Sequence, residues 1–209
     1  MERYASQMNA RREAQAAGTR QDIVRAAGRL MLQHGYVGTS IGAIATEAGV
    51  AVQTIYNSVG SKAELLAAVL ERAASASGSP DAVAAAMRQR IDDAHSASDI
   101  IRALADGCAL VNERTAGIQQ IVSEAAAVDD DVAAFERRRD TTRLHDFGED
   151  AAALRSRRSL RVGLSDHEAA AAIWALAHPQ GYRTLVRDVG WSAETYRDWL
   201  EKTLRGALL

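Results

Sequence analysis

The stretch AGVAVQTIYNSVGSK, residues 48–62, places a glycine turn before a short run of amide and hydroxyl side chains. A helix over residues 52–59 has four polar side chains on one face and four apolar ones on the other. The polar four are Gln53, Thr54, Asn57 and Ser58, and the apolar four are Val52, Ile55, Tyr56 and Val59. Amides can pair with the N6 and N7 atoms of adenine, and short hydroxyls can bond base edges or phosphates at close range. The polar face therefore predicts contact with a DNA groove, and a solvated face without a role is the alternative.

The residues just before this stretch predict a second short helix. Thr39 or Ser40 is a suitable N-cap, and apolar residues at spacings of three and four form one stripe over residues 41–48. Gly49 breaks the pattern after little more than two turns. Two short helices joined by a turn with glycine are the helix-turn-helix arrangement. Lys62, at the start of the helix that follows, is then placed to meet a phosphate.

Two longer helices are expected to flank the helix-turn-helix. The first is expected to begin after Thr19, a good N-cap, and to end at Gly35, which can adopt a left-handed conformation. Residues before it, about 1–17, are expected to form a disordered arm. The other begins at Ser61, which with Glu64 makes an S-x-x-E capping box.

The amino-acid composition limits the class of protein to which the chain can belong. The chain has 209 residues, of which 47% are hydrophobic and 25% charged, as in ordinary globular proteins. No run approaches the roughly 18 apolar residues of a membrane helix, and the N-terminus lacks the apolar core of a signal peptide, so we expect a cytoplasmic protein. The net charge is −2, yet residues 1–72 carry eight basic against six acidic side chains. That asymmetry has the sign expected if only the first segment meets phosphate.

The whole chain reads as helical, because it has two prolines, many alanines and apolar residues at spacings of three and four. The segment SASGSP at 75–80 is the candidate joint between two domains, which we place at residues 1–72 and 73–209. Beyond the joint, helices are expected roughly over residues 81–95, 98–114, 117–127, 129–157, 166–188 and 192–208.

The segment HGYVGTSIGAIATEAGVAVQTIYNSVGSKAELLAAV, residues 34–69, resembles the DNA-binding signature of the TetR family of transcriptional regulators. That signature has a G-[FY] helix end, a T-[ST]-[VI] helix start, and the elements I-A-x-x-A-G-V, T-[LI]-Y and S-K-x-x-L. Nearly every element is present and in register. The resemblance implies an all-α chain, with an N-terminal three-helix DNA-binding domain followed by a C-terminal helical bundle for ligand binding and dimerisation.

The resemblance also implies roles for single residues. It implies that backbone phosphates are held by Thr39, Ser40, Thr54, Tyr56 and Lys62. It implies that bases are read by Gln53, Asn57 and Ser58. The family usually has aromatic or histidine residues around positions 57–59, and this chain departs from that pattern.

The segment IWALAHPQGYRTLVRDVGWSAETYRDWLEKTL, residues 173–204, resembles the closing segment of many family members. Segments 166–188 and 192–208 carry long apolar stripes. We expect each to pair with its copy in a four-helix arrangement about a two-fold axis, because one helix-turn-helix reads too few bases. A homodimer of this kind implies a palindromic double-stranded DNA operator.

A mostly apolar cavity is expected within residues 98–188, as the site of an uncharged or weakly polar small-molecule effector. Its expected walls are the segments 98–114, 117–127 and 166–188, in which polar groups are sparse. The side chains proposed to line it or to orient a ligand are Cys108, Asn112, Gln119, Trp174, His178 and Tyr182. A filled helical core, in which each of these is satisfied locally, is the alternative.

The tract RRRDTTRLHDFGED, residues 137–150, gathers His145, Asp146 and Glu149, which can be read as metal ligands or acid/base groups. A single tract rich in both charge signs is more typical of a solvated helix side. The sequence therefore predicts a repressor released from its operator by an effector, with no cofactor, metal or catalytic residues. The alternatives are a helical enzyme or metal-binding protein that uses this tract, and a DNA-binding protein without a ligand.

Overall fold

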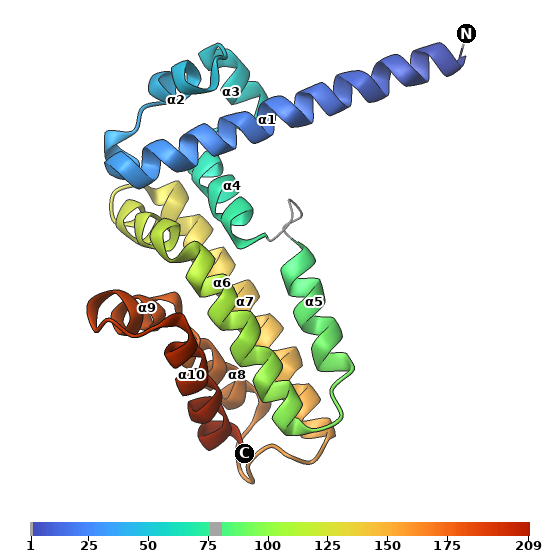
Figure 1. Cartoon of the computed structure of the whole chain (residues 1–209), viewed down its shortest axis with the longest axis vertical. Coiled ribbons are helices and arrows are strands. Elements are labelled where there is room, and N and C mark those ends of the chain that lie inside the picture. Colours follow the sequence, from blue (N-terminus) through green and yellow to red (C-terminus); the bar gives the residue numbers. More distant parts are fainter. Residues whose placement is uncertain (1, 76–80) are drawn as a thin grey trace. The chain divides into compact units, whose positions relative to one another are not determined.

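The structure is a computed structural model that describes residues 2–75 and 81–209, with side chains from residue 11 to 75 and from 85 onward. All regular secondary structure in this part of the chain is helical, which confirms the all-α prediction (Figure 1). Most of the expected joint at 75–80 lies outside the described residues. Within the described residues, no helix is both long enough and apolar enough to cross a bilayer.

The helices follow one another with short connections (Figure 1). They are α1 (Glu2–Gly38), α2 (Ile41–Ala48), α3 (Val52–Ser58), α4 (Lys62–Ala74), α5 (Asp81–Asp92), α6 (Ala97–Ala126), α7 (Asp130–Ser156), α8 (Asp166–Leu176), α9 (Pro179–Tyr182), the π-helix η1 (Arg183–Asp188) and α10 (Ala193–Leu208).

The chain divides into two compact units. The first comprises the chain up to Arg72 together with Gln120–Phe135, and the second comprises Ala73–Gln119 and Glu136–Leu209. The segment 120–135, which the sequence analysis assigned to the second domain, therefore groups with the helix-turn-helix. Val122 and Val132 in this segment are fully buried.

Helix α1 begins at Glu2, so the chain is helical where the sequence analysis expected a disordered arm. Thr19 does not cap a helix, because its hydroxyl donates instead to the Gln15 carbonyl, 3.1 Å away within the helix. Alanine, glutamine, glutamate and arginine dominate residues 10–17, and these are strong helix formers that carry α1 past the expected start.

The other end of α1 breaks at Gly35, as expected from its sequence. Gly35 has φ 70° and ψ 176°, a conformation open to glycine and strained for any other residue. Apolar side chains of α1 to α4 then form the core of this unit. Its most deeply buried members are Ile23, Ala27, Met31, Ile44, Ile55, Leu65 and Leu66.

Helix α6, which runs from the second unit into the segment 120–135 of the first, is one unbroken helix where two were expected over residues 98–114 and 117–127. Thr115 donates its hydroxyl to the Val111 carbonyl (2.7 Å), and Ala116 is buried, so packing carries the helix across Gly117. A single glycine weakens a helix by only about 1 kcal/mol, which the burial of neighbouring residues offsets.

The expected continuous helix over 166–188 is wrong. It ends at Leu176, because the residue before a proline disfavours helical geometry and Pro179 has no N–H to donate. His178 then caps α9, since its Nδ1 accepts a hydrogen bond from the Gln180 N–H at 3.2 Å. At the other end, Ser165 and Glu168 form a capping box that fixes the start of α8.

Candidate DNA-binding face and effector cavity

The turn between α2 and α3 sets the position of α3. Ser40 caps α2 by accepting the Ala43 N–H at 3.0 Å, which leaves its own hydroxyl hydrogen free at the surface. Gly49 ends α2 in the left-handed conformation, with φ 67° and ψ 34°. The Val50 N–H donates back to the Ala45 carbonyl at 3.0 Å, which closes the turn.

One buried side chain anchors α3. Ile55 is fully buried, whereas Val52 and Tyr56 are 44% and 49% exposed. Of the four apolar residues of the expected inward face, Ile55 is therefore the fully buried one and Val59 is half-buried, because a helix of seven residues contacts its unit along a narrow line. Arg20 of α1 donates to the Ser58 carbonyl at 2.5 Å and holds the far end of α3.

The polar face of α3 is open. Gln53 and Asn57 are both exposed, and the Gln53 amide nitrogen donates to the Asn57 amide oxygen at 3.0 Å. This contact leaves the Gln53 oxygen and both Asn57 amide hydrogens unpaired, a set that can meet the donors and acceptors of a base edge. Thr54 and Ser58, half-buried, lie beside the pair.

Thr39 does not present its side chain to a ligand. It is 1% exposed, and its hydroxyl donates to the Gly35 carbonyl at 2.8 Å. Its place at the N-terminal side of α2 is the reason, since the hydroxyl satisfies a carbonyl that the break at Gly35 leaves without a helical partner. The burial argues against the phosphate contact that the resemblance implies for Thr39.

Lys62 is engaged within its own unit. Its ammonium lies 4.3 Å from the centre of the Tyr36 ring, a cation–π contact. Burial lowers the pKa of Lys62, and the charge of Asp129 partly opposes that shift. The Tyr36 hydroxyl in turn donates to the Asp129 carboxylate at 2.6 Å. No sequence signal joins Tyr36 to Asp129, which follows it by 93 residues.

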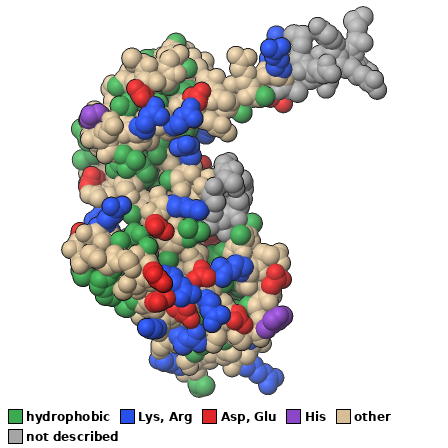
Figure 2. All heavy atoms as spheres, viewed as in Figure 1, with side chains coloured by type: hydrophobic (Ala, Val, Ile, Leu, Met, Phe, Trp, Pro, Cys, Tyr) green, Lys and Arg blue, Asp and Glu red, His purple; other side chains and the backbone are tan. Residues whose placement is uncertain are grey.

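Other basic side chains of the first unit are also paired. Arg29 forms an ion pair with Glu47 at 2.7 Å, and Arg25 pairs with Asp22. On the face of the molecule drawn in Figure 2, basic and acidic side chains lie interspersed, in keeping with the net charge of −2. Two basic side chains of this unit are thus neutralised by acidic partners rather than left to form a general positive field.

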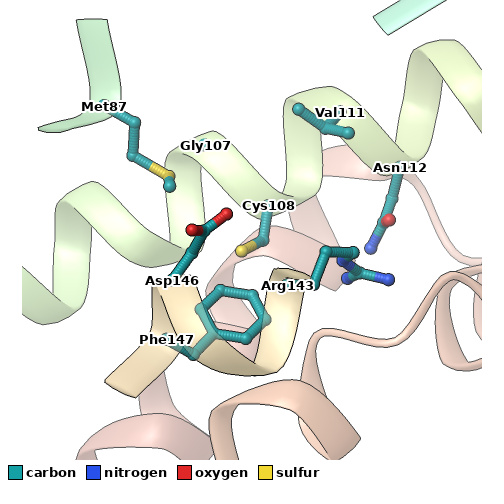
Figure 3. A pocket seen from close by; sticks show the side chains of 8 residues that line it. All are labelled: Met87, Gly107, Cys108, Val111, Asn112, Arg143, Asp146 and Phe147. Carbon is teal, nitrogen blue, oxygen red and sulfur yellow. The ribbon is translucent and has the colours of Figure 1, made fainter. Parts of the chain in front are cut away.

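The second unit contains a cavity of about 120 Å³ between α5, α6 and α7 (Figure 3). Its lining residues are Met87, Gly107, Cys108, Val111, Asn112, Arg143, Asp146 and Phe147. Gly107 permits the close approach of α5, because a Cβ there would lie 2.4 Å from the Met87 sulfur. The structure thus brings Cys108 and Asn112 to the cavity, together with α5 and α7 residues that the sequence analysis left out.

Two of the expected residues line the cavity. Asn112 already donates hydrogen bonds within the protein, and Cys108 is chemically inert. Asn112 donates to the Ala177 carbonyl at 3.0 Å and to the Tyr196 hydroxyl at 3.3 Å. Burial raises the pKa of the Cys108 thiol to about 12, so the thiol stays protonated and behaves as a small apolar group.

The other four proposed pocket residues lie outside this lining. Gln119 accepts a hydrogen bond from Arg139 at 2.9 Å, while its own amide nitrogen is buried without a partner in the described structure. The Trp174 ring nitrogen is unpartnered in the same way, and the ring packs edge-on against His178. Tyr182 is buried against Tyr196, with ring centres 4.8 Å apart, and belongs to the core.

The acidic tract of α7 does not converge on one site. Asp146 faces the cavity, whereas His145 lines a shallow depression on another side of the helix with Asp166 and His167. Glu149 is exposed. Across the described ranges, no group of three His, Cys, Asp or Glu side chains is placed to hold a metal ion. The structure therefore does not bring His145, Asp146 and Glu149 together in one site.

The sequence analysis missed the buried charges of α7. Arg139, Arg143 and Phe147 recur every four residues, which places them on one face of the helix. Asp150 lies near this face, is 6% exposed, and has its pKa raised to about 7 by burial and then by the charges of its acidic neighbours. The spacing of four residues could have indicated this shared helix face, but the many charged residues of the tract concealed it.

Comparison with known proteins agrees with this architecture. Residues 23–69 match the family model described as bacterial regulatory proteins, tetR family. No curated protein matches the chain.

Several solved structures share the fold over nearly the whole chain. NalD of Pseudomonas aeruginosa, the secondary repressor of the MexAB-OprM multidrug efflux pump, superposes with a TM-score of 0.71 at 21% identity, over 93% of this chain and 98% of its own. A putative TetR-family regulator from Mesorhizobium loti gives 0.66 at 18%, over 92% and 96%. FadR from Bacillus subtilis, in complex with stearoyl-CoA, gives 0.69 at 14%, over 90% and 99%.

Proposed function

We propose that this chain, a TetR-family protein by its N-terminal domain and its fold, is a repressor that leaves its operator when a small molecule binds the second unit. The observation that carries the proposal is the exposed amide pair of Gln53 and Asn57 on α3. A turn closed by Gly49 and a single buried anchor, Ile55, position that helix.

The amide pair suits adenine. One amide can accept from the N6 amino group while the other donates to N7, and the contact between Gln53 and Asn57 holds the two groups in register. Ser40, Thr54 and Tyr56 offer hydroxyls to the flanking phosphates, and Ser58 lies at the edge of the face. Such contacts fix the register of a recognition helix, and the base contacts give the specificity.

Lys62 is the one proposed phosphate ligand that must rearrange. Its ammonium now lies over the Tyr36 ring, so a phosphate has to compete with a partly buried cation–π contact. Such a contact stabilises by about 0.5–2 kcal/mol, and a phosphate hydrogen bond at a DNA surface can exceed it. The exchange would release the Tyr36 ring when DNA binds.

The active form is proposed to be a homodimer through segments 166–188 and 192–208. A two-fold dimer presents two copies of α3 to a palindromic operator. Sedimentation velocity at micromolar concentration tests the assembly. A single species with the mass of one chain would exclude it.

The effector is proposed to enter the cavity beside Arg143. An effector weakens operator binding only if it favours a conformation in which the two reading helices no longer match their half-sites. Each part of the proposal has a counterpart among proteins of this fold. The structure of FadR holds stearoyl-CoA, which parallels effector binding, and NalD is a repressor, which parallels repression.

Selection of bound sequences from random DNA tests the reading face. Gln53→Ala and Asn57→Ala should each lower discrimination between the selected site and its point variants by about 1–3 kcal/mol. Gln120→Ala is the matched control, because Gln120 and Glu124 form a similar exposed pair, four residues apart, on α6. An unchanged consensus with both α3 variants would show that α3 does not read the operator in this way.

A further inference from the structure

Two arginines of α7 are half-buried and have no acidic partner. Several other arginines of the second unit form ion pairs, as Arg197 does with Asp106 at 2.7 Å and Arg155 with Asp166 at 2.5 Å. Among the described residues, no carboxylate comes within 4.0 Å of Arg139 or Arg143. A buried cation without a counter-charge is costly, so its presence calls for a physical reason.

Few of the donors on these two arginines are used. Each guanidinium has five N–H groups. Arg139 donates one to the Gln119 amide oxygen at 2.9 Å. Arg143 reaches only the Ala177 carbonyl, at a long 3.5 Å, and its guanidinium lies 5.8 Å from the centre of the Phe147 ring. Most of their hydrogen-bonding capacity is therefore unsatisfied by the protein.

The surroundings of the arginines are electropositive. Burial, and then the charge of Arg143, lowers the pKa of Arg139 to about 10, and the same two causes lower the pKa of His178. Burial also lowers the pKa of Arg143. Glu136 and Asp140 lie near enough to oppose these shifts but not to form ion pairs. At neutral pH both guanidiniums remain charged and His178 is uncharged.

The unpartnered buried groups nearby are donors as well. They are the Gln119 amide nitrogen, beside Arg139, and the Trp174 ring nitrogen, whose ring centre lies 4.9 Å from that of His178. Guanidinium, amide nitrogen and indole nitrogen all require acceptors. The two nitrogens lie outside the cavity lining, so Arg143 is the donor of this group that a ligand in the cavity can meet.

We infer that the effector is a small organic monocarboxylate, held by the Arg143 guanidinium in the cavity between α5, α6 and α7, with Arg139 as a second positive charge. A guanidinium and a carboxylate match as two parallel hydrogen bonds. Met87, Val111 and Phe147 line the same cavity and provide an apolar wall for the rest of the ligand (Figure 3). The inference names the chemistry of the effector and so rests on the proposed function. It replaces the uncharged ligand expected from the sequence.

The same lining limits the size and charge of the ligand. Asp146 lies in the wall with Arg143, and its carboxylate repels a second negative charge, which disfavours a phosphate dianion. A cavity of about 120 Å³ is slightly smaller than the roughly 150 Å³ that accommodates benzene in a protein core. A carboxylate on a short aliphatic chain fits these dimensions.

Titration calorimetry on the full chain, without DNA, tests the inference with matched probes. Butanoate and pentanoate should bind at least about tenfold more tightly than butanamide and pentanamide, which have the same shape without the charge. Inorganic phosphate should not bind measurably. The inference is overturned if neither carboxylate binds, if the amides bind equally well, or if only phosphate binds.

Variants of α7 separate recognition from folding. Arg143→Met keeps the length of the side chain and should remove the preference for carboxylate over amide, while the melting temperature of the free protein stays the same or rises. Arg143→Lys keeps the charge without the planar fork and should retain part of the preference. Arg138→Met, exposed on the same helix, is the control and should bind as the original chain does. Undiminished carboxylate binding by Arg143→Met would refute the assignment.

The two proposals fail separately. If carboxylates bind but the chain selects no DNA sequence, the chemistry of the cavity stands and the proposed function does not. If the chain selects an operator and discriminates bases through α3, yet the amides bind as well as the acids, only the inference about the effector fails.

Discussion

Removing the hydrogen bond between Tyr36 and Asp129 should destabilise the first unit by a measurable amount. The bond joins the end of α1 to the turn between α6 and α7 at 2.6 Å, and the tyrosine is 7% exposed. Tyr36→Phe deletes the hydroxyl and keeps the ring, so the contact with Lys62, 4.3 Å from the ring centre, is preserved. The substitution therefore isolates one charge-assisted hydrogen bond.

The expected magnitude follows from burial and charge. Hydrogen bonds to charged groups contribute about 1.5–3 kcal/mol. Asp129 is only half-buried, so water replaces part of the lost bond. We therefore expect the free energy of unfolding to fall by about 1–2 kcal/mol.

A double-mutant cycle measures this contribution. Urea unfolding at pH 7 of the original chain, Tyr36→Phe, Asp129→Asn and the double variant should give a coupling energy of about 1 kcal/mol, since asparagine can still accept a weaker bond. Tyr56→Phe is the control, because Tyr56 is 49% exposed and makes no hydrogen bond in the described structure. Its effect should stay within about 0.5 kcal/mol.

The coupling should also depend on pH. The Tyr36 hydroxyl is the main cause that lowers the pKa of Asp129, so this carboxylate is more acidic in the folded chain than in the unfolded one. The stabilisation is then fully present above the ordinary carboxyl pKa and is lost as the pH falls through the lowered folded value. Coupling below about 0.3 kcal/mol at pH 7, or coupling that grows on acidification, would refute the reasoning.

Three further substitutions have expected outcomes. Gly35→Ala should lower the free energy of unfolding by about 1–3 kcal/mol in thermal denaturation, because φ 70° with ψ 176° is strained for alanine. Ser165→Ala should cost about 1 kcal/mol by the same measurement, since it removes the capping box of α8. Asp150→Asn should stabilise the chain relative to the original by a margin that grows between about pH 4 and pH 7 and is constant above. The folded pKa of Asp150 is raised to about 7, so as pH rises the unfolded state loses its proton first; a margin that does not change with pH would contradict this. The charged groups that act on it are Asp146, Glu149, Arg88 and Asp92.

The helix-turn-helix could be predicted because its signals are local. Within sixteen residues, Ser40 caps α2, Gly49 forms the turn and Ile55 anchors α3. Each acts on the backbone or on neighbours in the same segment. The amides of α3 are exposed for the same reason, since seven residues anchored by one isoleucine leave the opposite face in solvent. Local chemistry of this kind is visible in a single sequence.

Features that depend on distant residues could not be predicted. The position of Lys62 follows from Tyr36, which Asp129 holds by a hydrogen bond, and nothing near Lys62 in the sequence indicates these contacts. Residues 98–126 form one helix because packing outweighs the weakness of Gly117, which the sequence alone shows only as a break.

Helix α7 shows how a high density of charge conceals a partly buried face. Glu136 and Arg139, and Asp140 and Arg143, stand three residues apart, a spacing at which a solvated helix forms ion pairs. Neither pair forms in the structure, and both guanidiniums turn instead toward the interior of the second unit. The two arginines therefore do not form these surface ion pairs. They take a partly buried position instead, which costs free energy in the free protein. If a carboxylate binds Arg143 as we propose, it offsets that cost in the bound state alone.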